Sequence, residues 1–218
     1  MRKHVSLDEA KAILEDGKAV ILDTDTVPGI AVASNRPDAL HVLYESKSRD
    51  SKKPIAWLVS SSSDLHLYGE NVPDYAILLA DAFWPGALTL IVRASDEVGK
   101  EFAAEDGTIG LRMPNDASCI ALMKSLGYAL ATTSANASGT KTPSTSLEIH
   151  DDFAKDVPLL SVSSRGANSS IAANPITSQA STVIDCTGDK PCLIREGAIP
   201  FSDIEKVLDT KTGVDSCE

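Results

Sequence analysis

The 218-residue sequence lacks any apolar run close to the roughly 18 residues that a membrane-spanning helix requires. Its first residues also lack the apolar core of a secretory signal. From these two absences we expect a cytoplasmic protein with no membrane contact. Internal repeats are missing as well, which argues against a barrel of repeated βα units.

Sequence patterns typical of metal sites are also missing. The four cysteines, at positions 119, 186, 192 and 216, include no CxxC pair, and the four histidines show neither HxH nor HExxH spacing. No protein-bound metal is therefore expected. Cys119 lies in an apolar, helix-like run and is interpreted as a small buried hydrophobe. Cys186 and Cys192 flank TGDKP and could face each other across a hairpin, but reduced core thiols are expected in a cytoplasmic chain.

Basic residues are few relative to acidic ones. The chain has 20 Lys and Arg against 31 Asp and Glu, which gives a net charge of −11 at pH 7. A negative overall field repels nucleic-acid phosphates, so weak or no direct binding to nucleic acid is expected. The signatures GxxxxGK[ST] and GxGxxG are absent, so a bound nucleotide would not be held by a P-loop or a dinucleotide-binding turn.

Helix and strand signals alternate along the chain. Pro37 suits the first position of a helix, and Pro85 ends another that starts near residue 72. Helix caps are predicted at three places: Ser6 with Glu9, Asp116 with a stop at Gly127, and Ser202 with Glu205. Strands are predicted in apolar runs: 19–22, 55–59, 87–92, 108–113, 128–133, 158–162 and 181–186. This pattern predicts an α/β protein with a single open, twisted, mixed sheet and flanking helices.

The length suits one domain, predicted over residues 1–207, followed by a polar tail over 208–218. Residues 163–179 are rich in Ser, Ala and Asn without periodicity and predict a surface loop. Because this loop leads into Ser181, one hypothesis is that it closes over a binding site as a lid.

Four polar stretches occupy strand ends or turns, where α/β proteins place binding groups. They are DTDTVPG at 23–29, KSRDSKKP at 47–54, GLRMP at 110–114 and TTSANASG at 132–139. Each alone is consistent with a solvated turn or helix end. Together they combine Lys and Arg with hydroxyls, amides and loop N–H groups, which are the donors that bind phosphate oxygens. The residues therefore indicate a polyanion site.

Seven segments, in order, extend this pattern: DTDTVPGI, KSR, FWPGALTLIV, GLRMP, TTSANASG, STVID and LIREG. Over about residues 6–205 the chain resembles the YrdC/Sua5 family of L-threonylcarbamoyladenylate synthases. The KxR…SxN signature of that family corresponds to Lys47-Ser48-Arg49 and Ser134-Ala135-Asn136.

This resemblance implies an enzyme that forms threonylcarbamoyl-AMP and pyrophosphate from L-threonine, bicarbonate and ATP, with Mg²⁺ on the ATP. The product would pass to a tRNA threonylcarbamoyl transferase for the modification of adenosine 37 in tRNA. The implied fold surrounds a large cationic cavity. Longer members add a C-terminal domain, so we expect this chain to be a short form.

The resemblance also implies roles for individual residues. Catalytic roles fall on Lys47, Arg49 and Arg112. Contacts to ATP fall on Arg49, Lys53, Thr108, Ser134, Asn136, Thr142 and Arg195. Contacts to threonine fall on Thr26, Arg112, Thr132 and Ser181.

The chain departs from the family pattern at three positions. Asp23 replaces a Pro, Pro28 replaces a Tyr, and Leu58 stands where many members carry a His. The last two departures support an alternative, in which the chain is a paralogue that binds RNA or a nucleotide without turnover. A third hypothesis is carbamoyl-adenylate chemistry on a different amine.

Overall fold

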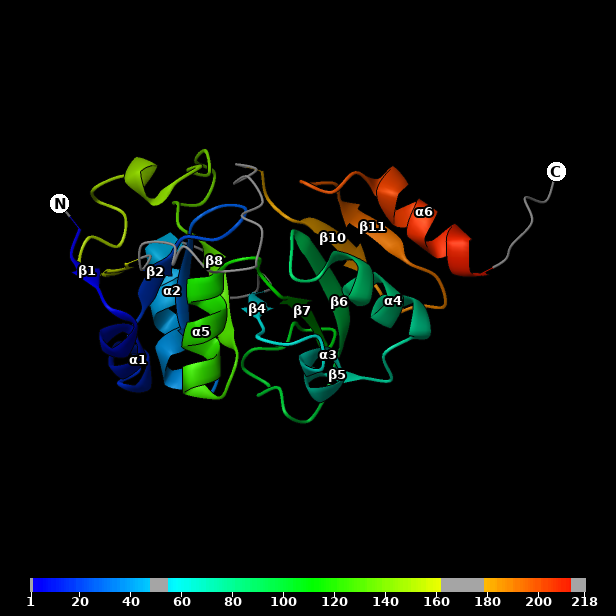
Figure 1. Cartoon of the computed structure of the whole chain (residues 1–218). Coiled ribbons are helices and arrows are strands. Elements are labelled where there is room, and N and C mark those ends of the chain that lie inside the picture. Colours follow the sequence, from blue (N-terminus) through cyan, green and yellow to red (C-terminus); the bar gives the residue numbers. More distant parts are fainter. Residues whose placement is uncertain (1, 48–54, 162–178, 213–218) are drawn as a thin grey trace.

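The computed structural model of the protein describes residues 2–47, 55–161 and 179–212. Over these residues the strands form one 11-stranded mixed sheet with flanking helices, which confirms the predicted fold class (Figure 1). The α-helices are α1 (Leu7–Glu15), α2 (Leu40–Lys47), α3 (Asp64–Tyr68), α4 (Asp74–Phe83), α5 (Ala117–Leu126) and α6 (Phe201–Thr212), with short 3₁₀ turns η1 (Pro37–Ala39) and η2 (Ser146–Glu148). The strands are β1 (His4–Val5), β2 (Val20–Leu22), β3 (Gly29–Ala33), β4 (Ala56–Leu58), β5 (Gly69–Glu70), β6 (Leu88–Ala94), β7 (Thr108–Arg112), β8 (Leu130–Ser134), β9 (Leu159–Leu160), β10 (Thr182–Asp185) and β11 (Cys192–Arg195).

The sheet joins segments that are far apart in the sequence. Its order is β1-β9-β2-β3-β8-β4-β7-β6-β10-β11, and β5 pairs with β6. Four pairs are parallel (β1 with β9, β2 with β9, β4 with β7, β6 with β10), and the other pairs of the described strands are antiparallel. Helices α1, α2 and α5 gather at one end of the sheet, and α4 and α6 at the other (Figure 1). None of the helices in the described part of the chain has the length and apolar character needed to cross a membrane.

Two of the three predicted helix caps are confirmed. At α1, the Ser6 hydroxyl accepts a hydrogen bond from the Glu9 backbone, and the Glu9 carboxylate accepts one from the Ser6 backbone. At α5, the Asp116 carboxylate accepts from the Cys119 N–H, and Gly127 ends the helix in the left-handed region at φ 78°. A glycine there avoids the steric cost that a Cβ would bring.

The third predicted cap is wrong. Helix α6 begins at Phe201, which places Ser202 inside its first turn rather than at its cap. The Pro200 carbonyl already accepts a hydrogen bond from the Asp203 N–H, so the chain turns before Ser202. The helix continues to Thr212, so the first residues of the predicted tail belong to it. The predicted loop over 163–179, apart from Gln179, lies outside the described residues.

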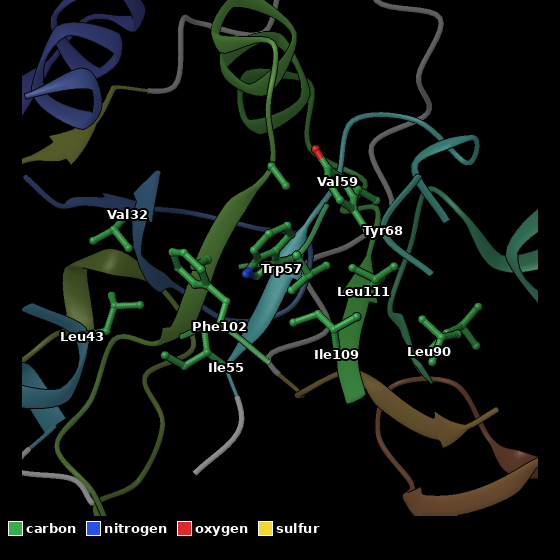
Figure 2. Close-up of a cluster of buried hydrophobic side chains, with 14 of the residues drawn as sticks. Val32, Leu43, Ile55, Trp57, Val59, Tyr68, Leu90, Phe102, Ile109 and Leu111 are labelled. Atoms are coloured by element: carbon green, nitrogen blue, oxygen red, sulfur yellow. The ribbon is translucent and has the colours of Figure 1, made fainter. Parts of the chain in front are cut away.

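Alternate residues of the central strands face two apolar cores. In β2, Ile21 belongs to one core, while Val20 and Leu22 belong to the other. Trp57 of β4 lies in the first core, where its ring stands edge-on to Tyr68 and Phe102 with centroids 5.1 and 5.3 Å away (Figure 2). Helices α1 and α5 cover the second core. Burial on both faces explains why these strands are nearly continuous apolar runs in the sequence.

The burial predicted for Cys119 and Cys186 is confirmed, but the prediction of a core position for Cys192 is wrong, because this residue is exposed at the start of β11. Cys119 and Cys186 are buried, Cys192 is exposed, and all three are free thiols. Cys186 and Cys192 flank the turn of the β10–β11 hairpin. Burial raises the pKa of the Cys119 thiol well above its ordinary value, as expected for a residue that acts as a small hydrophobe.

Candidate active site

A pocket of about 310 Å³ lies on the sheet, where neighbouring strands carry small side chains. Thr132 of β8, Ala56 of β4 and Gly110 of β7 lie directly opposite one another across three strands. Residues opposite one another in a sheet point to the same face. Of the three, Ala56 and Thr132 line the pocket, and neither has the bulk of Leu or Ile, which leaves room at this part of the face.

The pocket wall combines cations, hydroxyls and a few apolar side chains. Its volume lies at the lower end of the range, roughly 300–1,000 Å³, that is usual for ligand pockets. The lining residues are Leu22, Thr24, Thr26, Val27, Pro28, Gly29, Lys47, Ala56, Leu58, Thr89, Arg112, Thr132, Thr133, Ser134, Thr142, Ala180, Ser181 and Arg195.

Most of the site residues named from the sequence come together here. Those that line the pocket are Thr26, Lys47, Arg112, Thr132, Ser134, Thr142, Ser181 and Arg195. Asn136 does not line it but contacts Lys47 and Ser134, which do. Thr108 is not brought to the pocket wall: it begins β7, which Arg112 ends, and its hydroxyl donates to Asp106 at 2.7 Å. Arg49 and Lys53 lie outside the described residues.

Arg112 is the most tightly held cation of the pocket. Its Nε donates to the Gly86 carbonyl at 2.9 Å, Nη1 to Thr26 Oγ1 at 2.6 Å, and Nη2 to Asp25 Oδ1 at 2.5 Å. The side chains of both Arg112 and Asp25 are more than nine-tenths buried. Burial lowers the pKa of the Arg112 guanidinium, and the Asp25 carboxylate opposes that shift. These bonds use three of the five N–H groups of a guanidinium, so two remain for a ligand.

The hydroxyls of Thr24 and Thr26 are ordered by the turn that carries them. Thr24 Oγ1 donates to the Val27 carbonyl at 2.8 Å and accepts from the Thr26 N–H at 3.2 Å. The two hydroxyls lie 3.1 Å apart. A hydroxyl has one proton, and that of Thr24 is engaged, so Thr26 must donate to Thr24. Thr26 Oγ1 consequently faces Arg112 as an acceptor.

Lys47 joins the two halves of the predicted signature. It ends α2, is almost fully buried, and its Nζ donates to Ser134 Oγ at 2.7 Å and to Asn136 Oδ1 at 3.0 Å. Ser134 Oγ in turn donates to Asn136 Oδ1 at 2.7 Å. The ammonium is thus positioned by neutral oxygens at the pocket wall.

Arg195 is held more loosely, at the end of β11. Its Nε and Nη2 donate to the Ser181 carbonyl at 3.2 and 2.8 Å, and Nη2 lies 3.4 Å from Ser181 Oγ. Partial burial lowers the pKa of its guanidinium. Ser181 Oγ also lies 2.8 Å from Thr89 Oγ1 of β6, so a buried hydroxyl pair continues the network across the sheet.

Close backbone packing fixes the segment that carries Ser181. The fully buried Thr182 hydroxyl donates to the Ile199 carbonyl and accepts from the Gly197 and Ile199 N–H groups. A Cβ added at Gly197 would lie only 2.2 Å from the Ala180 carbonyl oxygen and 2.5 Å from the Ser181 carbonyl carbon. Only glycine allows this approach.

Three residues of this network, Thr24, Asp25 and Thr89, were not predicted as site residues from the sequence. Asp25 lies inside the DTDTVPG stretch, but its pairing with Arg112 joins positions 87 residues apart. Thr89 is a buried polar residue within the apolar run 87–92, and that contrast was the available signal. The departures at Pro28 and Leu58 both contribute apolar surface to the pocket wall.

The arrangement is chemically suited to an anion that also presents polar groups. Lys47, Arg112 and Arg195 supply positive charge, and the hydroxyls supply neutral donors and acceptors. The large cationic cavity named from the sequence stays a prediction, because Arg49 and Lys53 belong to it and are not described.

A family model described as Sua5/YciO/YrdC, telomere recombination, matches residues 12–197 of the chain. The chain belongs to this family. Among curated members, the threonylcarbamoyl-AMP synthase of Pyrococcus abyssi is 30% identical over 199 residues, which cover 91% of this chain and 56% of that protein. The synthase of Bacillus subtilis is 31% identical over 201 residues, with 92% and 56% covered. The chain thus spans little more than half the length of these two family members.

The fold of the family is shared as well. The solved structure of P. abyssi Sua5 complexed with L-threonine superposes with a TM-score of 0.83 at 27% identity, covering 95% of this chain and 61% of that one. The resemblance stated from the sequence motifs is therefore confirmed at the level of family and fold.

Proposed function

We propose that this protein is an L-threonylcarbamoyladenylate synthase, which forms threonylcarbamoyl-AMP and pyrophosphate from L-threonine, bicarbonate and ATP. The observation that carries the proposal is the similarity, over more than nine-tenths of the chain, to relatives named threonylcarbamoyl-AMP synthase. The pocket supports it, because residues to which the sequence motifs assign threonine and ATP contacts share one wall. These comparisons favour a synthase over a paralogue that only binds RNA or a nucleotide.

In the proposed reaction, the threonine amine first takes up CO₂ from bicarbonate to form a carbamate, with release of water. A carbamate oxygen then attacks the α-phosphorus of ATP, and the bond to the β-phosphate oxygen breaks as pyrophosphate leaves. Arg112 holds the threonine carboxylate with its two remaining N–H groups. Thr26, Thr132 and Ser181 orient the amino acid, and catalysis rests mainly on positioning.

Charge stabilisation is proposed for the other end of the pocket. Negative charge builds up on the departing pyrophosphate, and Lys47 and Arg195 lie at the wall to offset it. Arg49 and Lys53 are proposed to add to this charge. Ser134, Asn136 and Thr142 complete the proposed ATP contacts, and Thr108 is retained as an ATP contact only on the strength of the motif.

Mg²⁺ is proposed to enter with ATP. The donor set of the pocket consists of cations and hydroxyls, which suits phosphate oxygens rather than the metal ion itself. We therefore propose the triphosphate and water as the ligands of Mg²⁺, as is usual for this ion. When bound, the ion would neutralise part of the triphosphate charge.

The product is a mixed anhydride of a carbamate and a phosphate, which is an activated acyl group. We propose that a tRNA threonylcarbamoyl transferase consumes it for N6-threonylcarbamoyladenosine at position 37, in the cytoplasm. Since the transferase supplies the tRNA contact, this chain needs none of its own. A filter-binding titration that finds salt-sensitive affinity for tRNA would instead support the RNA-binding alternative.

The deciding assay incubates the pure protein with Mg²⁺, ATP, bicarbonate and labelled L-threonine. We expect pyrophosphate release that depends on threonine, and a labelled adenylate of the mass of threonylcarbamoyl-AMP. The B. subtilis synthase serves as the positive control, and an Arg49→Ala variant is expected to form no adenylate while remaining folded. Pyrophosphate release that does not depend on threonine but depends on another amine would support the third hypothesis, carbamoyl-adenylate chemistry on that amine. No release at all, beside an active positive control, would refute the proposal.

A further inference from the structure

Thr142 lines the pocket although it belongs to no helix or strand. It lies in the segment between β8 and β9, in which η2 is the one described element. Outside a sheet ladder, a residue keeps its place only through the contacts of its own segment. The position of Thr142 therefore depends on what ties this segment down.

The part of the segment before Thr142 is tied to the end of α2. The Ser138 N–H donates to the Lys47 carbonyl at 3.2 Å, and the Asn136 side-chain amide donates to the Thr140 carbonyl at 2.8 Å. These contacts come from the SxN signature and its neighbours. They fix the chain up to Thr140.

The part after Thr142 is held by the buried Pro143 and Ile149 and, through two hydrogen bonds to Ser146, by the carboxylate of Asp23. Its Oδ1 accepts from the Ser146 N–H at 3.0 Å, and its Oδ2 accepts from Ser146 Oγ at 2.7 Å. Each carboxylate oxygen thus takes one donor of the same residue, and hydrogen bonds to an ionised acceptor are the stronger kind. Thr142 lies midway between Ser138 and Ser146, so it is held from both sides.

Asp23 is itself fixed in place. It follows β2 directly, and its carbonyl accepts a hydrogen bond from Cys119 Sγ of α5 at 3.3 Å. Its neighbours Leu22 and Thr24 both line the pocket, whereas Asp23 does not. One short stretch therefore forms a wall of the pocket and, through Asp23, anchors the segment that carries Thr142.

We propose that Asp23 is a positioning residue, which sets Thr142 at the pocket by holding Ser146. This inference rests on the proposed function for the identity of the nucleotide, ATP, that Thr142 contacts. Without the Asp23 carboxylate, the segment keeps its tie at Ser138 but loses the one at Ser146. Affinity for ATP falls, while the threonine end around Arg112 is undisturbed.

Steady-state kinetics test whether loss of the Asp23 carboxylate weakens ATP binding and leaves threonine binding unchanged. For Asp23→Ala we expect the KM for ATP to rise about tenfold, with kcat and the KM for threonine changed less than about threefold. Asp23→Asn retains an oxygen for the Ser146 N–H and an amino group for Ser146 Oγ, so it should restore most of the affinity for ATP. Ser146→Ala, which removes one of the two bonds, should fall between Asp23→Ala and the unaltered protein.

Hydrogen exchange tests the link without relying on activity. In Asp23→Ala, amides of residues 141–148 should exchange faster, while Ser138 and the amides of β6 (Leu88–Ala94) keep their protection. Faster exchange with the ATP-specific change in KM supports the proposal. Unchanged exchange in 141–148, or equal losses for ATP and threonine, overturns it. If the unaltered protein releases no threonine-dependent pyrophosphate, the proposed function fails, and exchange in 141–148 then decides by itself whether Asp23 holds this segment.

Discussion

Arg112 and Arg195 line the same pocket, but the protein holds them in different ways. The Arg112 side chain is more than nine-tenths buried, paired with the Asp25 carboxylate, and bonded to Gly86 and Thr26 as well. Arg195 is only partly buried, and its bonds go to the carbonyl and hydroxyl of Ser181. Burial lowers the pKa of both guanidinium groups, but only for Arg112 does a neighbouring carboxylate counter the shift.

This difference separates two properties of a cation, its charge and its shape. Asp25 offsets the charge of Arg112, so what Arg112 contributes is a rigid fork of N–H groups at a fixed place. Among the described residues, the contacts of Arg195 are neutral, so Arg195 contributes net positive charge. In the proposed reaction, the fork suits a carboxylate and the unpaired charge suits a polyphosphate.

The largest expected effect comes from breaking the buried pair. Asp25→Ala leaves the Arg112 charge buried without a counter-ion, which should lower the free energy of unfolding by about 3–5 kcal/mol. Urea denaturation measures the loss. The double variant Asp25→Ala/Arg112→Met removes both charges and should regain part of the stability. A loss below about 1 kcal/mol in Asp25→Ala would mean that Asp25 does not hold Arg112 as described.

Replacing each arginine by lysine tests shape against charge directly. Arg112→Lys keeps the charge but loses the fork, so affinity for threonine should fall about 100-fold, equivalent to about 2.7 kcal/mol. Arg195→Lys keeps the positive charge, which is what Arg195 contributes, so affinity for ATP should fall only about tenfold. Calorimetric titration of each ligand gives both values. Equal losses in the two variants would refute the distinction.

Gly197→Ala disturbs the backbone at Ser181, which holds Arg195, without changing any polar group. The added Cβ would lie 2.2 Å from the Ala180 carbonyl oxygen, so the backbone before Ser181 must shift. We expect a stability loss of about 1–3 kcal/mol and weaker binding of both ATP and threonine, because the shift moves Ser181 as well as the Arg195 that it holds. Gly188→Ala is the matched control, because its added Cβ would meet its nearest atom at 3.8 Å, an ordinary contact. Equal behaviour of the two variants would contradict the close packing.

Part of the pocket and of the fold follows directly from the sequence. Lys47 with Ser134 and Asn136, and Arg112 with Thr26, are brought together as the motif residues suggested. Local rules also predict the ends of α5 at Asp116 and Gly127, since capping depends on a few neighbouring residues. The predicted cap at Ser202 is wrong because the chain turns two residues earlier, at Pro200.

Other features depend on strand register, which no local pattern reveals. Strand β3 was missed because its sequence is Gly- and Ala-rich, and its pairing with β2 and β8 stabilises it. Likewise, the pocket-lining residues Ala56 and Thr132 lie side by side only because β4 pairs with β8 in this register. Thr89 belongs to this class, since its role follows from Ser181, 92 positions later.

Thr89→Val gives the smallest expected effect and tests the contact between Thr89 and Ser181, the residue that holds Arg195. The change removes the hydroxyl 2.8 Å from Ser181 Oγ while nearly keeping the shape of the side chain. Loss of one such bond should cost about 1 kcal/mol, seen as a roughly fivefold lower kcat/KM. Thr187→Val, two residues beyond the end of β10, removes a hydroxyl bonded to Asp185 and controls for a general loss of stability. If Thr89→Val changes kcat/KM no more than this control does, Thr89 does not orient Ser181. The hydrogen-bond network of Arg195 then ends at Ser181.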